Sequence, residues 1–149
     1  MKTRAVRLYG KKDLRLEEFD LPPIKEDEIL AKVVTDSLCM SSYKASSQGT
    51  DHKRIPDDVA ENPIIIGHEF AGELLEVGAK WADKFKPGDK FSIQPAIYYE
   101  GGPVGILSAP GYSYRYIGGD ATYVVIPNEV MEQDCLLPYH GEGYYPASL

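Results

Sequence analysis

The segment 62–78, NPIIIGHEFAGELLEVG, carries three glycines within an apolar, strand-like run. Its β-branched residues favour a strand, and a glycine inside a strand often marks a bulge or a point where another backbone comes close. A strand of this kind bends rather than running straight. The pattern therefore predicts a curved, barrel-like sheet that bends next to His68 and Glu69.

Five further segments have strand-like composition and are bounded by turn residues. They cover residues 3–10, 14–21, 28–38, 89–96 and 121–128. We expect the first two to pair as a hairpin around Gly10, and short helices to form over 39–49 and near 128–134. The predicted fold class is mainly β, a partly open barrel with a few short helices.

A tyrosine- and glycine-rich excursion, residues 98–119, interrupts this rhythm. Long excursions in compact domains tend to be functional or mobile. Its tyrosines at 112, 114 and 116 either line a substrate cleft or belong to a hairpin that packs its own rings, and the hairpin is the favoured interpretation.

Composition excludes several classes of protein. The 149 residues suffice for one domain, 1–149, and the net charge of −7 argues against nucleic-acid binding. No apolar run approaches the ~20 residues of a membrane span, and the N-terminus lacks the apolar core of a secretory signal. With only two cysteines no disulfide framework is implied, so a cytoplasmic protein is expected.

A buried histidine–glutamate pair needs a compensating metal or hydrogen-bond partner, because its burial otherwise costs several kcal/mol. Cys39 lies where a predicted strand opens into a helix, and zinc prefers sulfur and imidazole nitrogen. Alone, a cysteine is more often a small buried apolar residue. The conjunction of Cys39 with His68 and Glu69 favours a zinc site. In this site Glu69 either ligates the metal or contacts a ligand from outside the coordination sphere and tunes the metal.

The string GHEFAGELLEVG resembles the zinc signature of medium-chain alcohol and polyol dehydrogenases: Gly-His-Glu, two residues, Gly, five residues, Gly. FKPGDKF resembles the turn that follows it, and Cys39 stands where that family has its first catalytic zinc ligand. The chain is most similar to the sorbitol dehydrogenase branch, especially to L-sorbose 1-phosphate reductases. This resemblance covers the whole chain and implies an N-terminal GroES-like catalytic domain.

The resemblance also implies roles for individual residues. Cys39 and His68 would be zinc ligands, Glu69 an adjacent carboxylate that enters or leaves the coordination sphere, and Ser41 the hydroxyl that passes the substrate proton onward. The zinc would polarise a carbonyl while hydride moves to or from NAD(H) or NADP(H). The whole enzyme is expected to be a homo-oligomer.

Four positions depart from the family pattern or need a separate interpretation. Ser42 stands where many members have aspartate, and Lys44 where alcohol dehydrogenases often have a relay histidine, so the relay beyond Ser41 stays open. The excursion replaces the cysteines of a structural zinc. Trp81 is interpreted as a packing residue and Cys135 as a core residue.

The expected substrate is a polyol or a ketose such as L-sorbose 1-phosphate. A phosphate needs basic side chains to bind it, and the nearest candidates in the sequence are Lys44, Lys53 and Arg54. An ordinary solvated loop explains the same charges equally well.

The sequence lacks a dinucleotide fingerprint, because Pro146 follows Gly141-x-Gly143 where a third glycine is needed. We therefore expect a fragment without its nicotinamide-binding domain, catalytically inactive and weak in zinc binding, with a further glutamate ligand beyond Leu149. The alternatives are a non-catalytic GroES-like binding module and a metal-free quinone reductase of the same superfamily.

Overall fold

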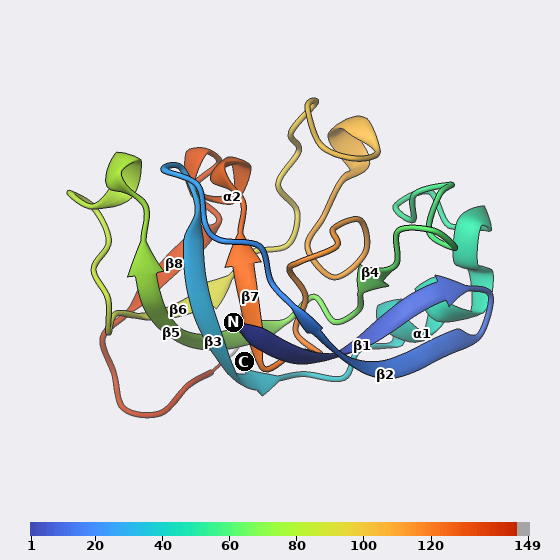
Figure 1. The fold of residues 1–149 in the computed structure, drawn as a ribbon, viewed down its shortest axis with the longest axis horizontal. Coiled ribbons are helices and arrows are strands. Elements are labelled where there is room, and N and C mark those ends of the chain that lie inside the picture. The colour runs from blue at the N-terminus through green and yellow to red at the C-terminus, as the bar shows by residue number, and fades with distance from the viewer. Residues whose placement is uncertain (146–149) are drawn as a thin grey trace.

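The computed structural model describes residues 1–145. They form a mainly β fold with few short helices and without a closed barrel, as the sequence predicts (Figure 1). The strands are β1 (Lys2–Gly10), β2 (Asp13–Asp20), β3 (Ile29–Asp36), β4 (Ile64–Ile65), β5 (Phe70–Val77), β6 (Lys90–Ile93), β7 (Tyr123–Ile126) and β8 (Leu136–Tyr139). The helices are α1 (Met40–Gln48) and α2 (Asn128–Glu132), with 3-10 turns η1 (Gly49–Asp51), η2 (Ala79–Trp81) and η3 (Gly105–Leu107).

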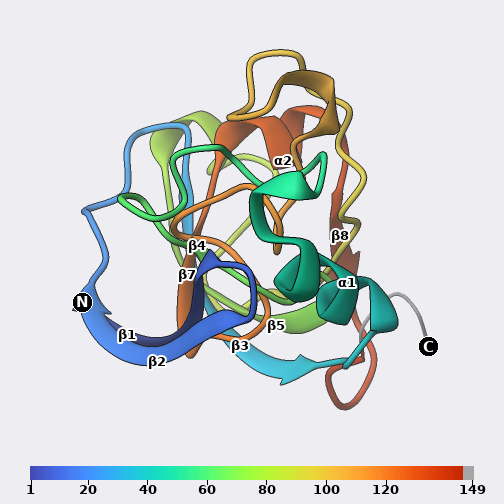
Figure 2. The ribbon, with the colours of Figure 1, turned by 90° about the vertical axis from the view of Figure 1, so that its right-hand side faces the viewer.

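The strands form two sheets. The smaller sheet has the order β2-β1-β4, and the larger has the order β7-β3-β5-β6-β8. The predicted hairpin is confirmed, since β1 and β2 pair antiparallel with Leu8 opposite Leu14. This hairpin extends away from the larger sheet toward α1 (Figures 1 and 2).

The segment 62–78 does not form the single bent strand that its composition predicts. Its first part, β4, pairs with β1 in the smaller sheet, whereas β5 pairs with β3 and β6 in the larger one. Gly67 lies between them with a φ of +97°, a conformation that favours glycine and ends the strand. The break leaves His68 and Glu69 in irregular backbone at the junction of the two sheets.

The predicted close approach of backbones along this segment is confirmed in β5. A Cβ added at Gly72 would lie 1.8 Å from the carbonyl oxygen of Lys32 on β3. Only glycine allows the two strands to pair at this distance.

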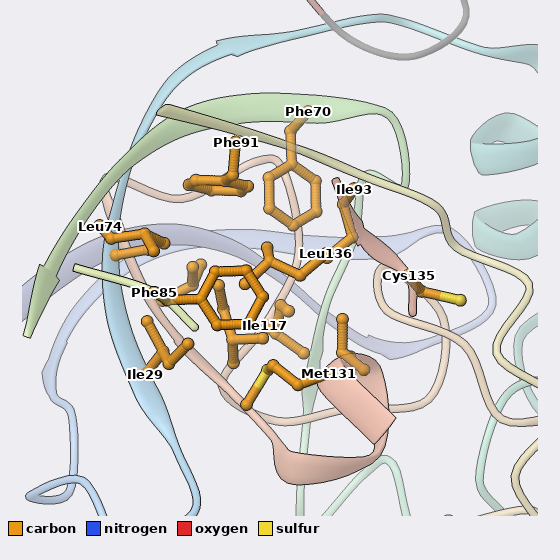
Figure 3. Packing of buried hydrophobic residues seen from close by; sticks show 14 of the residues in the cluster. Ile29, Phe70, Leu74, Phe85, Phe91, Ile93, Ile117, Met131, Cys135 and Leu136 are labelled. Atoms are coloured by element: carbon orange, nitrogen blue, oxygen red, sulfur yellow. The ribbon is translucent and has the colours of Figure 1, made fainter. Parts of the chain in front are cut away.

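The main core lies between the larger sheet and α2. Phe70 of β5 meets Phe91 of β6 edge to face, with ring centroids 6.2 Å apart (Figure 3). Cys135 is 5% exposed in this core, which confirms its predicted role. Trp81 packs against the same cluster, and its indole N–H donates to Asn128 Oδ1 at 3.0 Å.

The excursion 98–119 contains only the short turn η3. Its tyrosines do not pack on one another as the favoured interpretation held. Tyr112, Tyr114 and Tyr116 belong to three different hydrophobic clusters, so the excursion joins separate parts of the domain.

Within residues 1–145, no helix has the length and apolar character needed to cross a membrane.

Candidate metal centre

Cys39 is placed by the end of a strand and the start of a helix. Strand β3 ends at Asp36, and Cys39 is the N-cap residue of α1 with extended backbone (φ −125°, ψ 144°). Its side chain makes no capping hydrogen bond and is partly exposed. The thiol is therefore available for another partner.

His68 is the most buried member of the site, at 7% exposure. Its Nδ1 lies 3.2 Å from the Tyr112 hydroxyl and 3.4 Å from Ser42 Oγ, while its Nε2 lies 3.5 Å from Glu69 Oε1. Burial lowers the pKa of His68 below its ordinary value, opposed by the Glu69 charge. The ring is thus held in the neutral form that metals bind.

Ligand atoms of Cys39, His68 and Glu69 all lie within 4.8 Å of one another. Two ligands of one tetrahedral zinc are about 3.5 Å apart, given bond lengths of about 2.0 to 2.3 Å. The His68–Glu69 separation of 3.5 Å already has this value. A thiolate, an imidazole and a carboxylate are also the donor types that zinc selects, so the residues fit that ion.

The irregular backbone before His68 is clamped by the excursion. The Gly119 N–H donates to the Gly67 carbonyl at 2.7 Å, and the Asp120 N–H donates to the Ile66 carbonyl at 3.0 Å. A Cβ added at Gly111 would lie 2.2 Å from the Gly67 carbonyl oxygen. These contacts between backbones hold in place the segment that precedes His68.

The model of the alcohol dehydrogenase GroES-like domain matches residues 25–135, a span that includes the three converging ligands. The chain belongs to this family. The GroES-like fold and the family resemblance predicted from the Gly-His-Glu signature are therefore confirmed.

Relatives of this GroES-like domain include enzymes of sugar phosphates. L-sorbose 1-phosphate reductase from Klebsiella pneumoniae is 59% identical over 147 residues, covering 99% of this chain and 35% of that protein. Mannitol-1-phosphate 5-dehydrogenase from Aliivibrio fischeri is 46% identical over 147 residues, covering 99% of this chain and 34% of that protein. The chain thus spans about a third of the length of these relatives.

A solved structure has the same fold. That of 2R,3R-butanediol dehydrogenase from Bacillus subtilis matches with a TM-score of 0.70 at 26% identity, covering 96% of this chain and 42% of that chain.

Ser41 lies in the first turn of α1 and is half-buried, two residues after Cys39 of the candidate metal centre. Its hydroxyl lies near enough to Tyr112 to oppose the rise that burial causes in the pKa of that phenol, and the Tyr112 hydroxyl in turn contacts His68. Sequence reasoning placed Tyr112 in the excursion but did not connect it with His68. The one available signal was Gly111 before it, a residue type that permits close packing of backbones.

A carboxyl pair, Asp36 and Asp120, lies against Gly67, the residue before His68, and was not predicted. The two side chains are hydrogen-bonded to each other, and both approach Gly67 closely enough to exclude a Cβ there. Burial raises the pKa of Asp36 to about 9, and the hydrogen bond to Asp120 and the charges of Asp120 and Glu69 act in the same direction. Asp36 is therefore protonated at neutral pH and donates to Asp120.

This pair predicts a pH-dependent stability. Between its ordinary pKa of 3.8 and about 9, folded Asp36 keeps a proton that the unfolded chain releases, so stability falls as pH rises through this window. Asp36→Asn keeps a donor to Asp120 and cannot ionise. The free energy of unfolding should therefore fall by about 2 kcal/mol less in the variant than in the wild type between pH 5 and 9. This figure is reduced because Asp36 is partly exposed.

Denaturant unfolding of the metal-free wild type and variant at several pH values measures this difference. Parallel stability curves for the two proteins would show that Asp36 does not carry the effect.

The three basic residues predicted to grip a phosphate are not gathered at the site. Lys44 and Lys53 are exposed, and Lys53 lines a cleft of about 580 Å³ that three aspartates also line, which disfavours a phosphate there. Arg54 is half-buried and donates from Nη1 to the Leu107 carbonyl at 2.6 Å. Among the three basic residues, Arg54 is the one whose charge contributes, after burial, to lowering the pKa of His68.

Proposed function

We propose that this chain is the metal-binding catalytic domain of a nicotinamide-dependent oxidoreductase that acts on a polyol or ketose. The observation that carries the proposal is the convergence of Cys39, His68 and Glu69 in a domain of the alcohol dehydrogenase family. A binding module without catalysis, or a metal-free reductase, has no need to bring a thiol, an imidazole and a carboxylate together.

In this proposal Cys39 and His68 hold a zinc ion, and Glu69 enters or leaves the coordination sphere of that ion. The ion, when bound, supplies Lewis-acid polarisation of a substrate carbonyl or alkoxide oxygen. The Ser41 hydroxyl transfers a proton to or from that oxygen. Its place in the first turn of α1, two residues after Cys39, supports this role.

The nicotinamide cofactor would be held by residues outside this sequence, which has no dinucleotide fingerprint. The greater length of the relatives is consistent with a separate cofactor-binding part in the whole enzyme.

The proposed substrate class is a sugar phosphate, supported by the names of two relatives at 59% and 46% identity. Within this chain, Arg54 is the favoured phosphate partner because its charge acts on the metal centre. An arginine fork is well suited to phosphate oxygens.

Zinc content and affinity test the metal proposal. The 149-residue chain and the whole enzyme are each dialysed, titrated with zinc against a chromophoric chelator, and assayed for reduction of ketose phosphates with NADH or NADPH. We expect metal-dependent turnover by the whole enzyme, none by the 149 residues alone, and tighter zinc binding by the whole enzyme. Turnover by a metal-free whole enzyme would overturn the proposal in favour of the quinone-reductase alternative.

Arg54→Gln in the whole enzyme should raise KM for a sugar phosphate about 10-fold, because a charged hydrogen bond of about 1.5 kcal/mol or more is lost. KM for the unphosphorylated sugar should change less than about 2-fold, since that substrate lacks the partner. Lys53→Gln is the matched control and should alter neither value. An equal rise in KM for both sugars after Arg54→Gln would assign Arg54 a structural role through Leu107 instead.

A further inference from the structure

We propose that Tyr112 positions the His68 ring for metal binding, with Ser42 as a second hydroxyl partner. The inference rests on the proposed metal site and adds a residue from the excursion to it. Tyr112 is not itself a ligand, because its hydroxyl lies on Nδ1, whereas Nε2 faces Glu69.

The contacts between Tyr112 and His68 are of two kinds. The Tyr112 hydroxyl lies 3.2 Å from His68 Nδ1, and the two rings stack with centroids 5.1 Å apart at 28°. Tyr112 is 7% exposed and His68 is equally buried, so water competes little for the bond. Ser42 Oγ, at 3.4 Å from the same nitrogen, is a longer partner.

Ligation through Nε2 would select one tautomer of His68. A histidine that ligates through one ring nitrogen usually donates a hydrogen bond from the other, and that bond fixes the ring orientation. The Nε2 atom faces the ligand set, so a ring that ligates through Nε2 would carry its proton on Nδ1 and donate from there to the Tyr112 oxygen. Tyr112 thereby leaves the Nε2 lone pair free toward Cys39 and Glu69.

The Tyr112 ring is itself fixed without any metal. His52 stacks on it with centroids 5.6 Å apart at 12°, and His52 Nδ1 accepts a hydrogen bond from the Arg54 N–H at 3.1 Å. Gly111, the preceding residue, is pressed against the Gly67 carbonyl. Tyr112 therefore lies clamped between His52 and His68, and it can orient His68 before a metal arrives.

The partner is a neutral phenol rather than a carboxylate. Within residues 1–145, the Nδ1 hydrogen bonds of His68 go only to the hydroxyls of Tyr112 and Ser42. A carboxylate partner raises the basicity of a ligating imidazole. A neutral hydroxyl raises it far less. The arrangement orients His68 and would give a bound metal a weaker imidazole donor, so that the metal would be a stronger Lewis acid.

Tyr112→Phe keeps the stacked ring and removes only the hydroxyl. We expect it to weaken zinc affinity of the 149-residue chain by roughly 10- to 100-fold, the range found when outer partners of metal ligands are lost. The ligand-field bands of the Co²⁺-substituted variant should also shift. Unchanged affinity together with an unchanged Co²⁺ spectrum would overturn the proposal.

Tyr114→Phe is the matched control. Tyr114 lies in the same excursion, is 8% exposed, and donates from its hydroxyl to Glu129 Oε2 at 2.8 Å, in a cluster that contains neither Cys39 nor His68. It should lose a comparable hydrogen bond yet keep zinc affinity within about 2-fold. Equal weakening by both variants would reduce the role of Tyr112 to general stability of the excursion.

A measurement without metal separates this inference from the proposed function. Long-range ¹H–¹⁵N correlations of the metal-free wild type should show His68 as the Nδ1–H tautomer, with the Nε2–H form appearing in Tyr112→Phe. An Nε2–H tautomer in the wild type would overturn the positioning role, even if zinc binds. Absence of zinc binding by the whole enzyme, together with the expected tautomers, would overturn the proposed function and leave the positioning of His68 supported.

Discussion

Cys39→Ser is expected to lower the zinc affinity of this domain by about 1000-fold or more. The loss of an outer partner alone costs about 10- to 100-fold, and Cys39 would be the only thiolate in direct contact with the ion. Serine keeps the size of the side chain but stays a neutral hydroxyl at neutral pH, so it replaces the strongest donor with a weak one. Competition titration against a chelator of known affinity measures the change.

Cys135→Ala is the control for this prediction. Cys135 is the only other cysteine of the chain and lies in the core, with its thiol directed to the Gln133 carbonyl at 3.3 Å. It should lose some stability but no zinc affinity. If Cys135→Ala weakened zinc binding as much as Cys39→Ser, metal binding would depend on the core or on a different site.

Gly111→Ala is expected to destabilise the domain by about 3–5 kcal/mol. The residue has a φ of +86°, which costs a non-glycine residue about 1–3 kcal/mol, and its new Cβ would lie 2.2 Å from the Gly67 carbonyl oxygen. Both backbones are held by hydrogen bonds and cannot separate without losing them. Denaturant unfolding gives the free-energy change directly.

Gly88→Ala separates the cost of the positive φ from the cost of the steric contact. Gly88 has a similar φ of +93°, but a Cβ there meets no atom within 4 Å. It should therefore show only the conformational cost, about 1–2 kcal/mol. A Gly111→Ala variant no less stable than Gly88→Ala would mean that the excursion moves away from Gly67 at little cost.

The sequence predicted the metal cluster better than it predicted its surroundings. Cys39 and His68 were paired because each lies at the end of a strand-like run and because the Gly-His-Glu signature is specific. Their convergence with Glu69 in the structure agrees with that hypothesis, while metal binding stays a prediction. Tyr112 could not be connected with His68, because their contact joins positions 44 residues apart through irregular backbone with no periodicity.

The secondary structure was predictable where local composition decided it. The β1–β2 hairpin and both helices follow from local patterns, whereas the division of 62–78 between two sheets depends on pairing with distant strands. Strand β8 was missed because Pro138 lies inside it, and proline within a strand is tolerated at a sheet edge, where β8 lies. The Asp36–Asp120 pair was missed because nothing in either segment's sequence points to the other.

If the site binds a metal ion, the junction at Gly67 also determines when that ion can be captured during folding. Cys39 follows a strand of the larger sheet, whereas His68 lies on the connection from the smaller sheet to β5. Neither sheet alone brings the thiol and the imidazole together, and the excursion must also close over Gly67 to hold them. Such contacts between distant segments form late, because loop closure precedes any gain from them. Metal uptake would then be a final step of assembly, and an ion held with full affinity would report that both sheets have formed and docked.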